Sequence, residues 1–191
     1  MIELTRGSKR LFHELKHYSA ETYFHSIRVK SLTKAVLDHL IKTGKADYTQ
    51  SEINCILEGA LLHDVGKIYV RNYVLTKKAC LTDAEKTDIA VHTQKGAEEI
   101  CKELDGEGRE IIRNICLYHH ERIDGGGYYG KTDIPLYVQV VATCDAFDAL
   151  TSDRIYKAAM PPEVAVAMIE EQKCGAFSAV LVDSLKKAVR R

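Results

Sequence analysis

Apolar residues recur every three to five positions along most of this chain, and the strict alternation typical of strands is scarce. Between residues 20 and 41, for example, an apolar stripe runs from Tyr23 to Leu40, and Gly44 follows where a helix would stop. Only three prolines interrupt the chain, and proline is the residue that most strongly breaks a helix. The pattern therefore predicts an all-α fold.

About seven helices are expected from this spacing and from capping signals. Thr49-Gln-Ser-Glu52 and Thr82-Asp-Ala-Glu85 both have the form of a capping box, which marks the start of a helix. The expected helices span residues 20–41, 49–62, 82–104, 108–120, 134–151, 162–174 and 177 to the end. Residues 138–150 are apolar almost throughout, so we expect this helix to be central and the most buried. The longest segments without a helical pattern are 66–81 and 121–134.

Composition and charge narrow the class of protein. A length of 191 residues suits one compact domain, residues 1–191, and no repeat or linker-like segment divides it. Lysine plus arginine (27) equals aspartate plus glutamate (27), so the charge gives no reason to expect a nucleic-acid polymer or a membrane as partner. No apolar run is long enough for a membrane span. Six scattered cysteines without a Cys-x-x-Cys pair indicate reduced thiols, and we expect a cytoplasmic protein.

Two polar clusters interrupt otherwise apolar helical segments. Residues 61–67 read Leu-Leu-His-Asp-Val-Gly-Lys, and residues 117–127 read Leu-Tyr-His-His-Glu-Arg-Ile-Asp-Gly-Gly-Gly. Burying imidazoles and carboxylates together costs much lost hydration, unless they bind a metal or are fully hydrogen-bonded. The clusters therefore indicate a functional site.

Imidazole and carboxylate ligands together suit iron, manganese or zinc better than calcium. The candidate ligands are Glu21, His25, His63, Asp64, His92, His119, His120 and Asp145. This set is too large for one ion, so it favours two neighbouring ions that share a carboxylate and a hydroxide. A single buried histidine is usually a hydrogen-bonded core residue, but five of them with several carboxylates are less easily explained in that way. His13 and His17, also four residues apart, lie in a polar stretch, and we interpret them as solvated.

The order of these residues resembles that of the HD superfamily of metal-dependent phosphohydrolases, and more narrowly that of its HD-GYP family. The narrower resemblance rests on four segments within a core of about residues 20–180: His63 to Lys67, His119 to Tyr128, Ile134-Pro135, and Asp145 to Lys157. It implies an α-helical domain with two or three divalent iron or manganese ions. It also implies a phosphodiesterase that hydrolyses cyclic di-GMP to pGpG, and onward to GMP, by attack of a metal-bridging hydroxide.

The resemblance further implies a role for each matching residue. One ion would take His25, His63 and Asp145, the other would take His92, His119 and His120, and Asp64 would bridge them. Glu21 matches a position that assists a third ion. Lys67 matches the family's catalytic lysine, and Arg154 and Lys157 match its phosphate-binding residues.

Some of these roles also have chemical reasons of their own. Lys67 would stabilise the charge that develops on the phosphate, or help to protonate the leaving ribose oxygen. Arg154 offers a planar fork for the second phosphate of a dinucleotide, although it could equally be an ordinary surface charge. Tyr128 could stack on a guanine base or simply belong to a turn. Asp124 and Asp148 are expected to orient ligating imidazoles, or else to cap a helix.

The chain departs from the family pattern in three places. Gly127-Tyr128-Tyr129 replaces Gly-Tyr-Pro, residues 68–71 lack the usual glycine and proline, and Phe177-Ser178-Ala179 replaces Phe-Asp-Pro. None of these is a candidate metal ligand, so they bear on substrate identity and partners more than on catalysis. Two alternatives therefore stay open: hydrolysis of another cyclic dinucleotide or a nucleotide, and a non-catalytic, metal-stabilised module that docks diguanylate cyclase domains.

Overall fold

The structure is a computed structural model that describes residues 4–106, 108–153 and 158–190. These residues form nine α-helices and one 3-10 helix, and they contain no strand, which confirms the all-α fold class. None of the described helices combines the length and apolar character that a transmembrane helix needs.

The helices follow one another along the chain with short connections. They are α1 (Arg6–Tyr18), α2 (Ala20–Lys42), α3 (Gln50–Leu62), the 3-10 helix η1 (Val65–Tyr69), α4 (Asn72–Leu75), α5 (Asp83–Glu103), α6 (Arg109–Tyr118), α7 (Leu136–Thr151), α8 (Pro162–Glu170) and α9 (Ala179–Val189). The seven expected helices correspond to α2, α3 and α5 to α9. The expected number was therefore too low by α1 and α4, and the expectation that 66–81 is irregular was wrong for η1 and α4.

Local chemistry explains where several helices begin. The Thr49 side chain accepts a hydrogen bond from the Glu52 backbone N–H, and the Glu52 carboxylate accepts one from the Thr49 N–H. The same reciprocal pair, Thr82 and Glu85, begins α5, so both predicted capping boxes are confirmed. The first helix escaped the apolar pattern because it is largely polar, although its Leu11 and Leu15 are fully buried.

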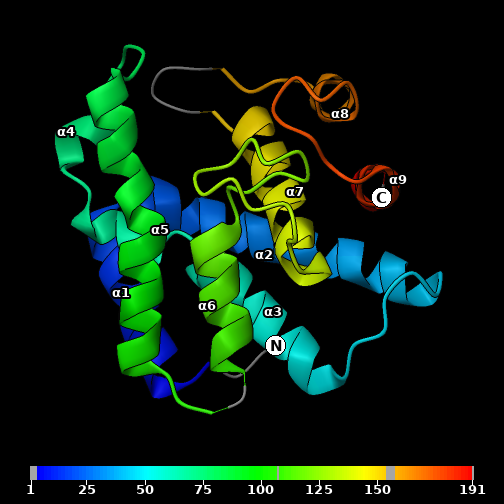
Figure 1. Ribbon diagram of the computed structural model, residues 1–191, viewed down its shortest axis with the longest axis horizontal. Coiled ribbons are helices and arrows are strands. Elements are labelled where there is room, and N and C mark those ends of the chain that lie inside the picture. Colours follow the sequence, from blue (N-terminus) through cyan, green and yellow to red (C-terminus); the bar gives the residue numbers. More distant parts are fainter. Residues whose placement is uncertain (1–3, 107, 154–157, 191) are drawn as a thin grey trace.

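The long helix α2 crosses the molecule and packs against α1, α3, α7 and α9 (Figure 1). α6 lies between α3 and α5, while α8 and α9 pack on each other and on α7. The main core lies among α2, α3, α7, α8 and α9, and a second core joins α1, α3, η1, α5 and α6. Eleven of the 16 residues of α7 are buried, from Val138 to Leu150, which agrees with its expected central place.

A glycine contact sets how closely η1 approaches α5. A Cβ atom placed on Gly66 would lie 1.9 Å from the carbonyl oxygen of His92 and 2.5 Å from the backbone nitrogen of Gly96. Because such distances are impossible for a side chain, only glycine permits this backbone contact. The contact holds the residue pair that precedes η1, His63 and Asp64, beside His92.

Candidate metal centre

Seven of the predicted ligands converge from five parts of the fold. His63 and Asp64 follow α3, His119 and His120 follow α6, and His25, His92 and Asp145 lie on α2, α5 and α7. They form two groups, Asp64 with His92, His119 and His120, and His25 with His63 and Asp145. Within each group the candidate ligand atoms all lie within 4.8 Å of one another. All seven side chains are buried except that of His120, which is partly exposed.

The Asp64 carboxylate lies between the two groups. Its Oδ1 is 3.3 Å from His92 Nε2 and 3.7 Å from His119 Nε2. Its Oδ2 is 3.4 Å from His63 Nε2 and 3.8 Å from His25 Nε2. One carboxylate oxygen therefore faces each group, which is the arrangement that a bridging ligand needs.

The imidazoles present unprotonated nitrogens to this carboxylate. The Nδ1 atoms of His63, His92 and His119 lie 2.8, 2.5 and 2.9 Å from backbone carbonyl oxygens one turn earlier. A carbonyl oxygen only accepts hydrogen bonds, so each Nδ1 carries a proton, and in the neutral imidazole the lone pair is then on Nε2. The buried Nε2 of His63 has no hydrogen-bond partner, which is costly in a protein interior unless a cation completes the site.

His25 is held by carboxylates at both ring nitrogens. Its Nδ1 lies 2.7 Å from Asp148 Oδ2, and its Nε2 lies 3.0 Å from Asp145 Oδ1. Burial acts to lower the pKa of His25, but the neighbouring carboxylates of Asp145 and Asp148 outweigh it and raise the pKa to about 9. Asp148 also accepts two hydrogen bonds from Arg28, at 2.8 and 2.9 Å. Asp148 thus contacts both the His25 imidazole and Arg28, a residue for which the sequence pattern carries no signal.

The remaining electrostatics favour neutral imidazoles beside ionised carboxylates. Burial and the neighbouring imidazoles hold the pKa of His119 well below its ordinary value and lower that of His120 to about 3. Burial acts to raise the pKa of Asp64, but Lys67, whose Nζ is 2.5 Å from Asp64 Oδ2, and the adjacent His63 keep it well below the ordinary value. Metal ligation requires this protonation pattern. The donor set therefore fits divalent metal ions.

Two predicted residues lie outside the two groups. Glu21 is exposed one turn before His25, and both residues line a small hollow of about 30 Å³ together with Lys67. Asp124 is exposed, and its Oδ1 accepts a hydrogen bond from the Gly126 N–H at 3.0 Å, which stabilises a turn. The structure does not bring Asp124 to the imidazoles.

Two further predicted residues, Arg154 and Lys157, lie outside the described residues.

The loop after His120 is fixed by Glu121, a residue that sequence reasoning missed. The buried carboxylate accepts hydrogen bonds from the backbone N–H groups of Tyr129, at 3.0 Å, and Lys131, at 2.7 Å. The first of these bonds is possible only because Tyr129 replaces a proline, which has no N–H. The loop positions Tyr128, whose ring centroid is 4.7 Å from that of His120. The available signal was an acidic residue directly after the histidine pair.

The helical fold and the buried histidine–aspartate cluster are those of a helical metal-binding domain, and sequence comparison identifies its family. The pattern of the HD domain family matches residues 22–150, and the chain belongs to this family. The name of one protein of known structure matches the HD-GYP resemblance that the motifs indicated. The structure of an HDG"Y"P protein from Bdellovibrio bacteriovorus superposes on this chain with a TM-score of 0.68 at 21% sequence identity. The superposition covers 88% of this chain and 52% of the Bdellovibrio chain. At that identity the likeness shows the fold.

Two curated relatives carry named activities. A cyclic di-GMP phosphodiesterase from Pseudomonas aeruginosa is 33% identical over 180 residues, which cover 92% of this chain and 41% of the relative. A 3'3'-cGAMP-specific phosphodiesterase from Vibrio cholerae is 36% identical over 133 residues, 68% of this chain and 28% of the relative. The chain thus spans less than half the length of either relative.

Proposed function

We propose that this protein is a metal-dependent phosphodiesterase that hydrolyses cyclic di-GMP to pGpG and onward to GMP. The observation that carries the proposal is the position of Asp64, with one carboxylate oxygen toward each group of imidazole nitrogens. The named activity of the relative from Pseudomonas aeruginosa supports the choice of substrate.

The proposed ligand sets are His25, His63 and Asp145 for one ion and His92, His119 and His120 for the other, with Asp64 shared. The mixed nitrogen and oxygen donors suit iron or manganese. Two such ions, when bound, supply an activated water and neutralise phosphate charge. Glu21, at the mouth of the hollow beside His25, is the proposed ligand of a third ion.

The protein's own residues do the remaining work. The Lys67 ammonium lies beside Asp64 and lines the hollow next to His25, so it can stabilise charge on the pentacoordinate phosphorus. From the same place its Nζ can donate a proton to the leaving ribose oxygen. Arg154 and Lys157 are proposed to bind the phosphate that is not cleaved, and Tyr128, partly exposed beside His120, to stack on a base.

A second candidate substrate is a mixed cyclic dinucleotide such as 3'3'-cGAMP. The relative from Vibrio cholerae is named for that activity, and Tyr129 changes the loop that carries Tyr128. A third alternative is a non-catalytic module that docks diguanylate cyclase domains on a metal-stabilised surface.

Product analysis with matched variants separates these possibilities. Protein loaded with iron or manganese is incubated with cyclic di-GMP, 3'3'-cGAMP or GMP, and the products are resolved by chromatography. We expect pGpG and GMP from cyclic di-GMP, and no product from the Asp64→Asn variant, which also loses metal by elemental analysis. Asp38→Asn, an exposed carboxylate paired with Lys34 on α2, is the control.

Four results would count against parts of the proposal. Unchanged cyclic di-GMP with both metals would reject the phosphodiesterase. Faster cleavage of 3'3'-cGAMP than of cyclic di-GMP would favour 3'3'-cGAMP as the substrate. An Asp64→Asn variant with full metal content would reject the bridging ligand, and docking of a cyclase domain without any hydrolysis would favour the non-catalytic module.

A further inference from the structure

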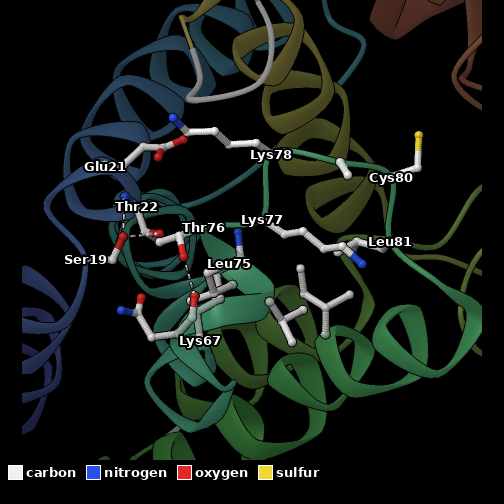
Figure 2. A pocket seen from close by; sticks show the side chains of 14 residues that line it. Ser19, Glu21, Thr22, Lys67, Leu75, Thr76, Lys77, Lys78, Cys80 and Leu81 are labelled. Atoms are coloured by element: carbon white, nitrogen blue, oxygen red, sulfur yellow. Dashed lines mark hydrogen bonds between the residues drawn. The ribbon is translucent and has the colours of Figure 1, made fainter.

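A cavity of about 370 Å³ lies beside the candidate metal centre, between the start of α2, residues 72–81 and α5. We call it the side pocket, and Figure 2 shows the side chains that line it. Glu21 and Lys67 line both the side pocket and the small hollow that contains His25. A ligand that reaches from the metal centre past Lys67 therefore enters the side pocket.

The walls of the side pocket combine apolar and hydroxyl-bearing side chains. Leu75, Leu81 and Ile89 line it and are partly buried rather than fully covered. Ser19 and Thr76 also line it, and each hydroxyl keeps acceptor capacity beyond the bonds it makes within the protein. Apolar surface with a few polar groups is typical of sites for small molecules. It suits a nucleobase, which has apolar faces and polar edges.

The side pocket also offers one uncommitted cation. Lys67 is paired with Asp64, and the Lys77 ammonium lies 2.5 Å from Glu85 Oε2. Lys78 is exposed, and among the described residues it forms no ion pair or side-chain hydrogen bond. Its side chain extends across the pocket mouth toward Glu21 (Figure 2). Lys78 is therefore free to bind an anion that arrives with the ligand.

We propose that the side pocket holds one nucleoside of the substrate while the phosphate on one side of that nucleoside lies at the metal centre. The base packs on Leu75, Leu81 and Ile89, and Lys78, whose side chain extends toward Glu21, pairs with a phosphate of the same nucleotide. The volume, at the lower end of the ~300–1,000 Å³ typical of ligand sites, suits one nucleoside and leaves the second one outside. This inference rests on the proposed function for the identity of the substrate.

Calorimetric binding of GMP and of inorganic phosphate to metal-loaded protein tests the inference without any turnover. Both ligands share the phosphate, so the ratio of their dissociation constants isolates the contribution of the nucleoside. We expect GMP to bind at least about tenfold more tightly than phosphate, and Leu75→Trp, which fills the pocket, to bring the ratio close to one. Phosphate affinity itself stays unchanged because the metal centre is intact.

Lys78→Ala is the milder variant, and together with the wild-type ratio of GMP to phosphate affinity it tests the inference if Leu75→Trp does not fold. It should raise the KM for cyclic di-GMP about tenfold with kcat unchanged, because it removes a charge contact that holds the bound nucleotide equally in the ground state and the transition state. Lys42→Ala, an exposed lysine at the other end of α2, is the matched control and should change neither value.

The outcomes separate this inference from the proposed function. If wild-type protein binds GMP no more tightly than phosphate, or if Leu75→Trp folds and keeps the wild-type ratio, the nucleoside site is rejected. If Lys78→Ala behaves like Lys42→Ala, the role of Lys78 is rejected. If wild-type protein hydrolyses no cyclic dinucleotide but its GMP preference is lost in Leu75→Trp, the proposed substrate fails and the nucleoside site stands.

Discussion

Replacing Asp148 with asparagine should weaken one metal site and leave the other unchanged. The Asp148 carboxylate accepts a hydrogen bond from His25 Nδ1 at 2.7 Å and two from Arg28 at 2.8 and 2.9 Å. An asparagine at this position has only one oxygen. If that oxygen faces Arg28, the amide N–H₂ group faces His25 and favours the imidazole form with its proton on Nε2, the nitrogen that must bind the ion.

The expected loss of metal affinity can be estimated from the loss of the hydrogen bond between Asp148 and His25. Loss of the carboxylate that orients a ligating histidine typically reduces metal affinity about 10- to 100-fold, which equals about 1.4–2.7 kcal/mol. The fold itself should lose less, because the Arg28 side chain is 46% exposed and surface ion pairs contribute only about 0–1 kcal/mol. Asp148 is not a member of the group formed by Asp64, His92, His119 and His120, so the affinity of that group should not change.

Metal titration distinguishes the two sites. The variant is dialysed against buffers of fixed free metal concentration, and bound metal is measured by elemental analysis beside wild type and the exposed control Asp38→Asn. We expect two ions per chain for wild type, and one ion for Asp148→Asn over a range of free metal in which wild type holds two. Two ions bound with wild-type affinities would refute the orienting role of Asp148, and equal loss of both ions would refute the independence of the two groups.

Three other measurements test the centre and the fold. Because the His25 pKa of about 9 lies above its ordinary value of 6.5, its charge stabilises the metal-free fold fully below pH 6.5, and this contribution is lost as the pH rises through 9. Metal affinity should rise over the same interval as the proton leaves, so titrations showing no pH dependence would contradict the assignment. Gly127→Ala should lower the melting temperature and weaken activity, because its Cβ would lie 2.4 Å from Glu121 Oε1; a wild-type melting curve and rate would contradict this packing. Thr49→Ala should cost about 1 kcal/mol in urea denaturation through loss of the α3 cap, with metal content unchanged as the internal control.

Five of the candidate ligands could be found from the sequence because they form adjacent pairs at helix ends or interrupt the most apolar segment, whereas His25 and His92 are single histidines that gain meaning only from the rest of the set. His63-Asp64 and His119-His120 are such pairs, and Asp145 interrupts the most apolar segment. A polar residue at a position that the helical pattern assigns to the interior must find a partner there. Each segment therefore identifies its own candidate ligands, and folding brings these segments together.

Other features depend on contacts between distant segments and leave no local signal. Arg28 looks like an ordinary surface residue of α2, and only its contact with Asp148, 120 residues away, gives it a role. The single-turn helix α4 is too short to show a helical period. Asp124 is near the histidine motif in the sequence, but in the structure it is exposed and accepts a hydrogen bond from the Gly126 N–H.

The backbone contact between Gly66 and α5 constrains the geometry of the candidate metal centre but not the residues of the surrounding loops. It fixes the spacing between Asp64 and His92 through main-chain atoms, so altering side chains elsewhere cannot easily change that spacing. The side-pocket residues between Asn72 and Leu81, and the loop that contains Tyr128, lie in segments outside this rigid junction. Substitutions in these loops can thus change which phosphate ester is bound, while the distances within the candidate metal centre stay the same.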